Sequence, residues 1–237
     1  SLTKQISEKA LRYDLTVPFA RFVAQNRNDI IFPFKRYQMQ NVWRADKPQK
    51  GRYREFFQCD ADIVGTKSLL CEIELIQLYD DVFTKLNISG VKICINNRKI
   101  LSGIIELMNA TDRFDEIVIL LDKIETLGQE NLYNLLKEKG LAKDSISKLN
   151  DFLNVNNLED LSKLMQSSKI GMQGINELSY VYNAVNNVKL KTAVLQFDVS
   201  LARGLDYYTG CILEVKSSAV SIGSIGGGGR YDDLTSI

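Results

Sequence analysis

The 237-residue chain has no histidine and only four cysteines, and these scarcities exclude several kinds of chemistry. Cys59, Cys71, Cys94 and Cys211 lie far apart with no CxxC pair, so no metal-binding residue is predicted. Without histidine, Ser-His-Asp and Cys-His catalysis and any proton shuttle through a protein imidazole are excluded. Widely spaced cysteines are typical of a reducing compartment.

Long apolar runs and an excess of one charge are also lacking. No segment approaches the roughly 20 apolar residues of a membrane span, and no charged-then-apolar signal pattern opens the chain. Lys plus Arg total 30 against 29 Asp plus Glu, so the whole chain lacks the positive field of a non-specific nucleic-acid binder. We therefore expect a soluble cytoplasmic protein with no membrane partner, in which charge acts locally.

The hydrophobic pattern predicts a mainly β body with a helical insertion. The expected strands cover residues 31–43, 56–64, 91–95, 192–201 and 207–216, and the expected helices include 19–25, 68–87, 131–139 and 144–153. Pro18 is placed to open the first helix. The first two strands flank a turn-rich loop, as in a long antiparallel hairpin. Successive short amphipathic patterns from about 111 to 186 predict the inserted helical domain.

The segment from Lys35 to Arg54 is strongly basic, with seven cations and one anion, Asp46. Such a segment can bind an anion, or it can be a solvated hairpin tip. Period-two geometry places these polar and aromatic side chains on one face of the strand that follows: Phe56, Gln58, Asp60 and Asp62. Two carboxylates and an amide need polar partners if this face is covered; the alternative is that it faces solvent.

Two further segments combine glycines with charged or aromatic residues. LARGLDYYTG, residues 201–210, ends an alternating pattern and is either a site or a structural loop with an Arg–Asp pair. GSIGGGGRYD, residues 223–232, contains four consecutive glycines that either let a ligand lie against bare backbone or form a flexible turn. Neither segment spells GxxxxGK[ST] or GxGxxG, so P-loop and Rossmann interpretations lose support.

Taken in order, LRYDLTVPFAR, RADKPQKGRYREFFQCDADIVG, LARGLDYYTG and GSIGGGGRYDDL resemble the histidyl-tRNA synthetase family. The second string resembles class II motif 2, an arginine-bearing strand–loop–strand, and the third resembles the histidine-specific signature. Motif 2 alone is moderately specific, whereas both strings at this order and spacing are a strong match. The strings run in order from residue 11 to residue 234, so the resemblance spans nearly the whole chain.

The resemblance implies an α+β fold, with a class II synthetase-type antiparallel sheet flanked by helices and an inserted helical domain. The implied division is a catalytic core over 1–110, with the motif 2 hairpin, and 187–237, with the histidine signature and a glycine-rich strand. The helical insertion over 111–186 interrupts this core. The implied activity is that of a histidine–tRNA ligase, which activates L-histidine with ATP, accompanied by Mg²⁺, and transfers it to tRNA(His). The family forms homodimers.

The resemblance also implies how ATP is held. Arg44 and Arg203 are the implied catalytic residues, which grip the α-phosphate from two sides, and Arg44 also holds the attacking carboxylate. Asp46 and Arg52 lie nearby, and Phe56 stacks on adenine. The arrangement needs no catalytic base, because the substrate carboxylate is already ionised and needs only placement and neutralisation of developing charge.

The residues that the resemblance implies for histidine binding are Asp14, Thr16, Gln58, Asp62, Tyr207 and Tyr208. The first three hold the α-amino group, and Asp62 with Tyr208 reaches the imidazole. An amino acid without ring N–H groups leaves these polar partners unpaired, at about 1–3 kcal/mol each, which gives selectivity.

Motif 1, motif 3 and the anticodon-binding domain of the family are not visible, so the resemblance is to a catalytic-core fragment. Two other kinds of protein remain as alternatives. One is the non-catalytic, synthetase-like regulatory subunit of ATP phosphoribosyltransferase, and the other is a synthetase-like module that senses uncharged tRNA. The regulatory subunit is expected to lack the intact arginine–tyrosine signature, whereas Arg203 and Tyr208 are present here. The sensor module is expected to lose the ATP and histidine contacts, whereas Arg44, Gln58 and Arg203 are in place.

Overall fold

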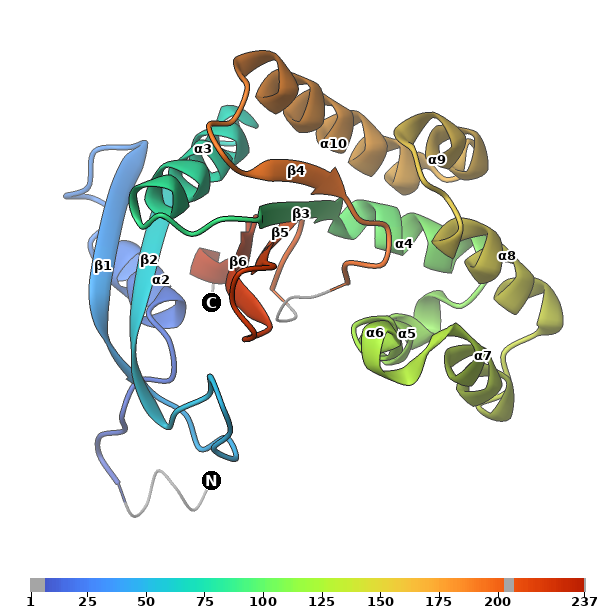
Figure 1. Ribbon diagram of the computed structural model, residues 1–237, viewed down its shortest axis with the longest axis horizontal. Helices are drawn as coiled ribbons and strands as arrows, with labels where there is room; N and C mark the ends of the chain where they lie inside the picture. The colour runs from blue at the N-terminus through green and yellow to red at the C-terminus, as the bar shows by residue number, and fades with distance from the viewer. Residues whose placement is uncertain (1–6, 203–206, 237) are drawn as a thin grey trace. The chain divides into compact units, whose positions relative to one another are not determined.

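The computed structural model describes residues 7–202 and 207–236, which form two compact units (Figure 1). The first unit is Ser1–Ser68 with Asp233–Ile237, and the second is Leu69–Asp232. The helical stretch 111–186 falls within the second unit.

The first unit is built on the predicted hairpin. Its elements are α2 (Thr16–Gln25), β1 (Phe34–Trp43), β2 (Glu55–Val64) and the 3₁₀ turn η2 (Leu234–Ser236). β1 and β2 are antiparallel, with a register that runs from Phe34 opposite Val64 to Trp43 opposite Glu55. β1 begins after Pro33, which cannot donate a ladder hydrogen bond. The prediction of a long hairpin is confirmed.

Helix α2 begins earlier than the sequence predicts. It starts at Thr16, so Pro18 lies inside the first turn, where a missing backbone N–H costs nothing. The Asp14 carboxylate accepts the backbone N–H of Val17 at 3.2 Å and so satisfies one free donor of this turn. The buried residues of α2 are Phe19, Ala20 and Val23.

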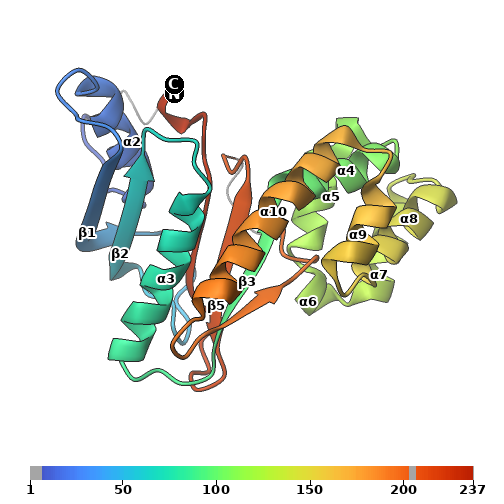
Figure 2. The same ribbon diagram turned by 90° about the horizontal axis from the view of Figure 1, so that it is seen from above.

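The second unit contains a four-stranded sheet in the order β4–β3–β5–β6. The strands are β3 (Val91–Asn97), β4 (Val194–Phe197), β5 (Cys211–Ser217) and β6 (Ser224–Gly229), and the helices beside the sheet are α3 (Leu70–Lys85), α4 (Arg98–Leu107) and α10 (Lys169–Val188). The pairs β3–β5 and β5–β6 are antiparallel, and β3–β4 is parallel. In both views α3 and α10 lie on one side of this sheet (Figure 1, Figure 2).

The predicted helical stretch is confirmed as a succession of short helices. They are η1 (Thr111–Arg113), α5 (Phe114–Leu121), α6 (Ile124–Leu127), α7 (Gln129–Glu138), α8 (Lys143–Leu153) and α9 (Leu158–Met165). Leu132, Leu149, Phe152 and Leu161 are fully buried and join one hydrophobic core with β3 and α4. Among the described residues, no helix is long and apolar enough to cross a membrane.

The strand predicted over 192–201 is shorter in the structure. β4 ends at Phe197 because Asp198 starts a turn. The Ser200 backbone N–H donates to Asp198 Oδ1 at 3.0 Å, and the Leu201 N–H donates to the Asp198 carbonyl at 3.1 Å. An aspartate that bonds its neighbouring backbone favours a turn over a ladder. Likewise, the strand predicted from residue 207 begins at Cys211.

The glycine cluster is a strand, so its interpretation as a flexible turn is wrong. β6 pairs with β5 from Ile212 opposite Gly229 to Lys216 opposite Ser224. A Cβ atom at Gly226 would lie 2.9 Å from the Tyr79 ring of α3. The Tyr79 hydroxyl donates to the Gly227 carbonyl at 2.9 Å. Glycine at 226 therefore allows the close approach of a helix side chain to the strand.

Helices α4 and α10 also approach each other closely through glycines. A Cβ at Gly103 would lie 2.6 Å from the Gly171 Cα, and a Cβ at Gly174 would lie 2.8 Å from the Ile100 backbone nitrogen. Backbone atoms cannot move aside as a flexible side chain can, so these glycines set the distance between the two helices.

We expect Gly103→Ala to lower the free energy of unfolding by about 2 kcal/mol, because the added methyl group forces the two helices apart. Alanine normally stabilises a helix interior by about 1 kcal/mol relative to glycine, so the expected sign is reversed. Urea unfolding measures the change. Gly223→Ala is the control, since nothing lies within 4 Å of its Cβ position. A Gly103→Ala protein as stable as the control contradicts the prediction.

Candidate active site

One face of the hairpin in the first unit carries a continuous row of polar side chains. In the antiparallel register, Arg36 faces Asp62, Gln38 faces Asp60, and Gln40 faces Gln58. Gln58 Nε2 donates to Asp60 Oδ1 at 2.7 Å, and the Thr16 hydroxyl lies 3.5 Å from Asp60 Oδ2. The start of α2 covers this face, since Asp14 and Asp62 are only 7% and 9% exposed. The end of this face that carries Asp62 is therefore buried, whereas Phe56, Gln58 and Asp60 are half-buried, and its carboxylates have polar partners.

Arg44 lies at the end of β1, beside this row. Its Nη2 donates to Gln58 Oε1 at 3.2 Å and its Nε donates to the Tyr13 carbonyl at 3.2 Å. The guanidinium lies over the rings of Tyr13 and Phe56, at 4.5 and 5.1 Å from their centroids. No carboxylate among the described residues pairs with it, and three of its five N–H donors have no partner there. A fixed guanidinium with free donors is suited to a phosphate or a carboxylate.

The carboxylates on this face are unequal. Burial raises the pKa of Asp60, the hydrogen bond from Gln58 partly opposes this, and the nearby charge of Asp62 raises it further. Arg36 lowers the pKa of Asp60 and Asp14 raises it, and the net direction is upward. Asp62 instead forms an ion pair with Arg36, with Nη2 and Oδ2 2.9 Å apart. The face thus combines an arginine-paired carboxylate with one whose hydrogen-bond partners are neutral.

Arg36 and Asp60 are residues of this face that the prediction of site residues did not include. Asp60 was placed on the correct face by its spacing, but Arg36 was counted only among the cations of the hairpin. The antiparallel register that puts Arg36 opposite Asp62 depends on the loop length, which sequence alone did not determine.

Asp46 and Arg52, predicted near ATP, lie in the loop between the strands. Both are exposed. The loop is closed by a hydrogen bond from the Arg44 N–H to the Arg54 carbonyl at 2.9 Å, and by a short bridge between Gln49 and Arg52. Neither Asp46 nor Arg52 has a side-chain hydrogen bond or ion pair with the polar row among the described residues. Their role in ATP binding therefore stays a prediction.

The histidine signature belongs to the second unit, and only part of it is described. Arg203, with residues 204–206, lies outside the described residues. Tyr207 contacts Tyr208 and Tyr231 edge to face, with ring centroids 5.0 and 5.8 Å apart. Ahead of the signature, Asn96 holds the chain by donating to the carbonyls of Val199 and Leu201 at 3.2 and 2.9 Å. Both described flanks of the signature are therefore held by specific contacts.

A buried ion pair anchors the segment that follows the glycines. Arg230 donates to both carboxylate oxygens of Glu72, at 2.6 and 2.9 Å. Its backbone carbonyl accepts the Thr209 N–H at 2.8 Å. A bidentate arginine–carboxylate pair fixes both distance and orientation. It ties the start of α3 to the two segments that carry the tyrosines.

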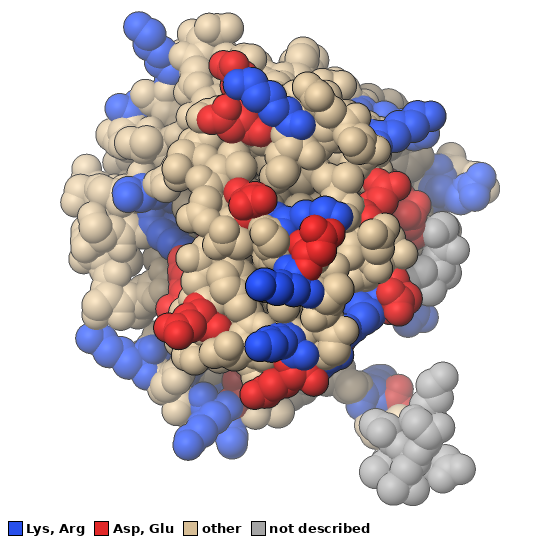
Figure 3. Space-filling model, turned by 90° about the vertical axis from the view of Figure 1, so that its right-hand side faces the viewer, with Lys and Arg blue, Asp and Glu red and all other residues tan. Residues whose placement is uncertain are grey.

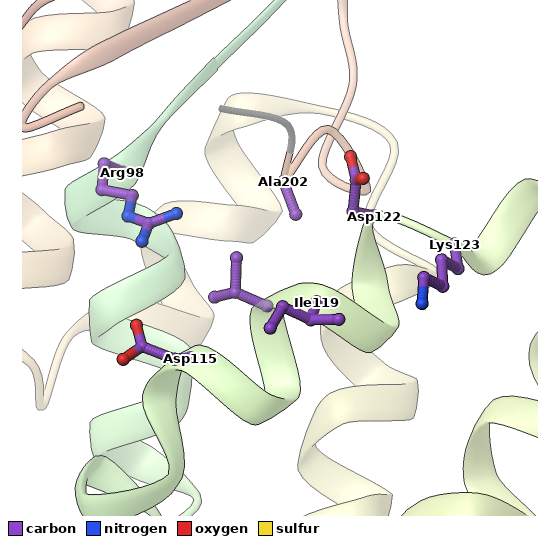
Figure 4. Close-up of a pocket in the computed structure, with 7 residues that line it drawn as sticks. Arg98, Asp115, Ile119, Asp122, Lys123 and Ala202 are labelled. Carbon is purple, nitrogen blue, oxygen red and sulfur yellow. The ribbon is translucent and has the colours of Figure 1, made fainter. Parts of the chain in front are cut away.

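A small cavity in the second unit lies outside the predicted site (Figure 4). Its lining residues are Arg98, Asp115, Val118, Ile119, Asp122, Lys123 and Ala202. Its volume is about 90 Å³, whereas pockets for small molecules usually exceed roughly 300 Å³. The Arg98 guanidinium is also engaged with the Phe114 ring, at 4.6 Å from its centroid. This cavity is too small for a nucleotide or an amino acid.

The helical part of the second unit shows charges of both signs. Figure 3 shows cations and anions interspersed in the described part of one face. Within the helical part, Lys148 pairs with Asp144 and Lys139 pairs with Glu116. Charge on this face therefore does not by itself indicate an RNA-binding surface.

Comparison with known proteins relates the chain to tRNA synthetases. It matches the histidyl-tRNA synthetase family over residues 5–237. It is 56% identical to a histidine–tRNA ligase of Flavobacterium johnsoniae, over 99% of this chain and 51% of that protein. A crystal structure of histidyl-tRNA synthetase from Nostoc sp. PCC 7120 has a TM-score of 0.84 and 33% identity, covering 95% of this chain and 54% of that one.

A third comparison shows the fold alone. An ATP phosphoribosyltransferase regulatory subunit/histidyl-tRNA synthetase from Bacillus halodurans has a TM-score of 0.82 but 23% identity, over 95% of this chain and 58% of that one. Fold alone therefore does not separate enzyme from regulatory subunit.

The α+β fold and the arginine-bearing hairpin are those of a class II aminoacyl-tRNA synthetase. The chain belongs to the histidyl-tRNA synthetase family. It spans about half the length of the curated relatives that it matches.

Proposed function

We propose that this chain is the catalytic core of a histidine–tRNA ligase, which forms histidyl-adenylate from L-histidine and ATP and then transfers the histidyl group to tRNA(His). The observation that carries the proposal is the Arg44 guanidinium, held over two aromatic rings beside Gln58 with no carboxylate partner among the described residues. Such a group is ready to bind an anion, and family membership suggests which anions.

In the proposed reaction, Arg44 binds both the α-phosphate and the substrate carboxylate. The carboxylate attacks the α-phosphorus in line, an oxygen–phosphorus bond forms, and pyrophosphate leaves. Arg44 neutralises the charge that develops on the phosphorus oxygens, and Arg203 is proposed to do so from the other side. ATP brings its own Mg²⁺, and no residue of this chain is assigned to that ion.

The polar row beside Arg44 is proposed to hold the amino acid. Asp14, Thr16 and Gln58 would bind the α-ammonium group, a role supported by the hydrogen bonds of Thr16 and Gln58 to Asp60 on the same face. Asp62 and Tyr208 would form hydrogen bonds with the nitrogens of the imidazole ring. Tyr207 contacts Tyr208 directly and would support it.

The remaining assignments rest on resemblance. Phe56 would stack on adenine, and Asp46 and Arg52 would approach ATP from the loop. Residues 111–186 are proposed as an insertion between two parts of the core, 1–110 and 187–237. Homodimer formation, a cytoplasmic location and contact with tRNA belong to the whole enzyme that we propose.

Histidine-dependent exchange of pyrophosphate into ATP, by a complete ligase that carries this chain, tests the proposal. A regulatory subunit of ATP phosphoribosyltransferase or a sensor of uncharged tRNA catalyses no such exchange. Exchange that is absent, or that does not depend on histidine, contradicts the proposed function.

We expect Asp62→Ala to weaken histidine binding by about 10- to 100-fold and ATP binding by less than about twofold, because Asp62 is proposed to contact only the amino acid. Isothermal titration calorimetry measures both affinities. Asp62→Asn keeps the shape of the side chain and serves as a second variant if Asp62→Ala does not fold. Asp29→Ala, an exposed change in the same unit, is the control. Equal losses for histidine and ATP contradict the assignment.

A further inference from the structure

The Arg36–Asp62 ion pair joins three parts of the first unit. Arg36 Nη2 lies 2.9 Å from Asp62 Oδ2 on β2, and it also donates to the Leu15 carbonyl, just before α2, at 3.1 Å. Arg36 Nη1 donates to Gln38 Oε1 at 2.5 Å. The guanidinium lies 4.1 Å from the centroid of the Phe19 ring in α2. Arg36 therefore fixes Asp62 relative to both strands and the helix.

The pair is also largely removed from water. The side chains of Arg36 and Asp62 are 10% and 9% exposed. A buried carboxylate without a counter-charge would favour the binding of a cationic group beside it, because that group would neutralise its charge. With Arg36 beside it, the two side chains together are neutral, and Asp62 keeps its capacity to accept hydrogen bonds.

One nitrogen of the Arg36 guanidinium has no hydrogen-bond partner among the described residues. This nitrogen, Nε, is buried. A buried donor without a partner costs free energy that a bound acceptor would recover. Neutral imidazole has one N–H donor and one acceptor nitrogen, whereas imidazolium has two donors and no acceptor. An acceptor carboxylate beside a free arginine donor therefore matches the neutral ring.

We propose that Arg36 is a specificity-determining positioning residue, which pairs with Asp62 so that the site accepts the neutral imidazole of histidine and disfavours cationic side chains. This inference rests on the proposed function of the same site. The charged groups near Asp62 are Arg36 on β1, which pairs with it, and Asp60 on β2, which interacts with the charges of Asp62, Arg36 and Asp14; Arg44 reaches the same face through Gln58. Among the described residues, Arg36 forms an ion pair with Asp62, with 2.9 Å between Nη2 and Oδ2.

The test is the pH dependence of the histidine KM in pyrophosphate exchange. In the unmodified enzyme, we expect KM to fall about tenfold from pH 5.5 to 7.5, because an imidazole with a pKa near 6.5 becomes neutral over this range. In Arg36→Met, Asp62 lacks the positive charge of Arg36 and should favour imidazolium, so KM should stay level or rise over the same range. The KM for ATP, measured alongside, should have the same pH profile in both proteins.

Further variants distinguish an effect of the Arg36 charge from an effect of Arg36 on the structure. Lys35→Met removes a cation from the opposite, exposed face of β1 and should keep the original profile. The double variant Arg36→Met/Asp62→Asn removes both charges and should regain a KM that falls with pH, even if Arg36→Met alone folds poorly. Asp60→Asn removes the other carboxylate of the row, and burial raises the pKa of that carboxylate. Made in the unmodified protein and in Arg36→Met, it should leave the pH profile of each unchanged.

A uniform rise in KM with an unchanged pH profile in Arg36→Met would show that Arg36 is only structural, and would overturn the inference. That result leaves the proposed function intact. A lack of histidine-dependent exchange in the unmodified enzyme overturns the proposed function instead.

Discussion

Replacement of Arg44 by alanine is expected to reduce histidine-dependent pyrophosphate exchange by about 10²–10³-fold, the size of loss seen when one preorganised charge-stabilising donor is removed. The reason is that Arg44 is already oriented before any ligand binds. Two aromatic rings and two neutral acceptors hold its guanidinium, so no reorganisation is needed when charge develops.

Arg44→Lys should recover only part of this loss, because an ammonium group cannot donate two parallel bonds to phosphate or carboxylate. Steady-state exchange kinetics at saturating ATP and histidine measure the effect. Arg54→Ala is the matched control, since Arg54 is exposed in the same loop and its side chain makes only a 3.5 Å hydrogen bond, to the Asp46 carbonyl, among the described residues. If Arg44→Ala and Arg54→Ala lose activity equally, the loss is not specific to Arg44 and the role proposed for it is wrong.

Asp80→Ala should lower the free energy of unfolding by about 3 kcal/mol at neutral pH, because it leaves three backbone N–H groups without partners. The buried Asp80 carboxylate accepts the N–H groups of Lys191, Thr192 and Ala193, at 2.5, 3.0 and 2.8 Å. These residues lie where the chain passes from α10 into β4. Asp80 thus holds this connection against α3.

The same contacts make this contribution dependent on pH. Burial alone would raise the pKa of Asp80, but the N–H donors of Ala193, Lys191 and Thr192 outweigh it and lower the pKa below its usual value. A lowered folded-state pKa stabilises the protein above the unfolded pKa of about 3.9, and the contribution is lost as the pH falls through the folded value.

Urea unfolding of the unmodified protein and of Asp80→Asn, at pH 7 and at successively lower pH, tests this sign. The difference between the two should be constant above about pH 5 and shrink in more acidic solution. Asp81→Asn is the control, because Asp81 pairs with the exposed Lys191 side chain and should contribute less than about 1 kcal/mol. A difference that grows on acidification contradicts the argument.

Much of the local structure could be predicted from the sequence. Alternation predicted the hairpin and the faces of β2, because side chains of a strand alternate between its two sides. Short apolar periodicities predicted the helices between about residues 111 and 186. The errors occurred at ends, as at Phe197, where the Asp198 side chain ended the strand by bonding its own neighbours.

The candidate site was predicted less completely. The resemblance to the family implied Arg44, Gln58 and Asp62 as site residues, and the structure places all three on or beside one face of the hairpin, while their roles stay predictions. Arg36 was missed because its importance depends on lying opposite Asp62, 26 positions later, and register is not visible in the chain. The role of Arg203 stays a prediction, since that residue lies outside the described part.

The sequence by itself determined the secondary structure of most segments, the absence of imidazole chemistry and the family. Each of these depends on residue type and short-range spacing. Tertiary structure decided which distant groups meet: Arg36 with Asp62, Asp80 with residues 191–193, Glu72 with Arg230, and Gly103 with Gly171. These pairs form only when burial brings the segments together, and burial is what makes an unpaired charge or an added methyl group costly.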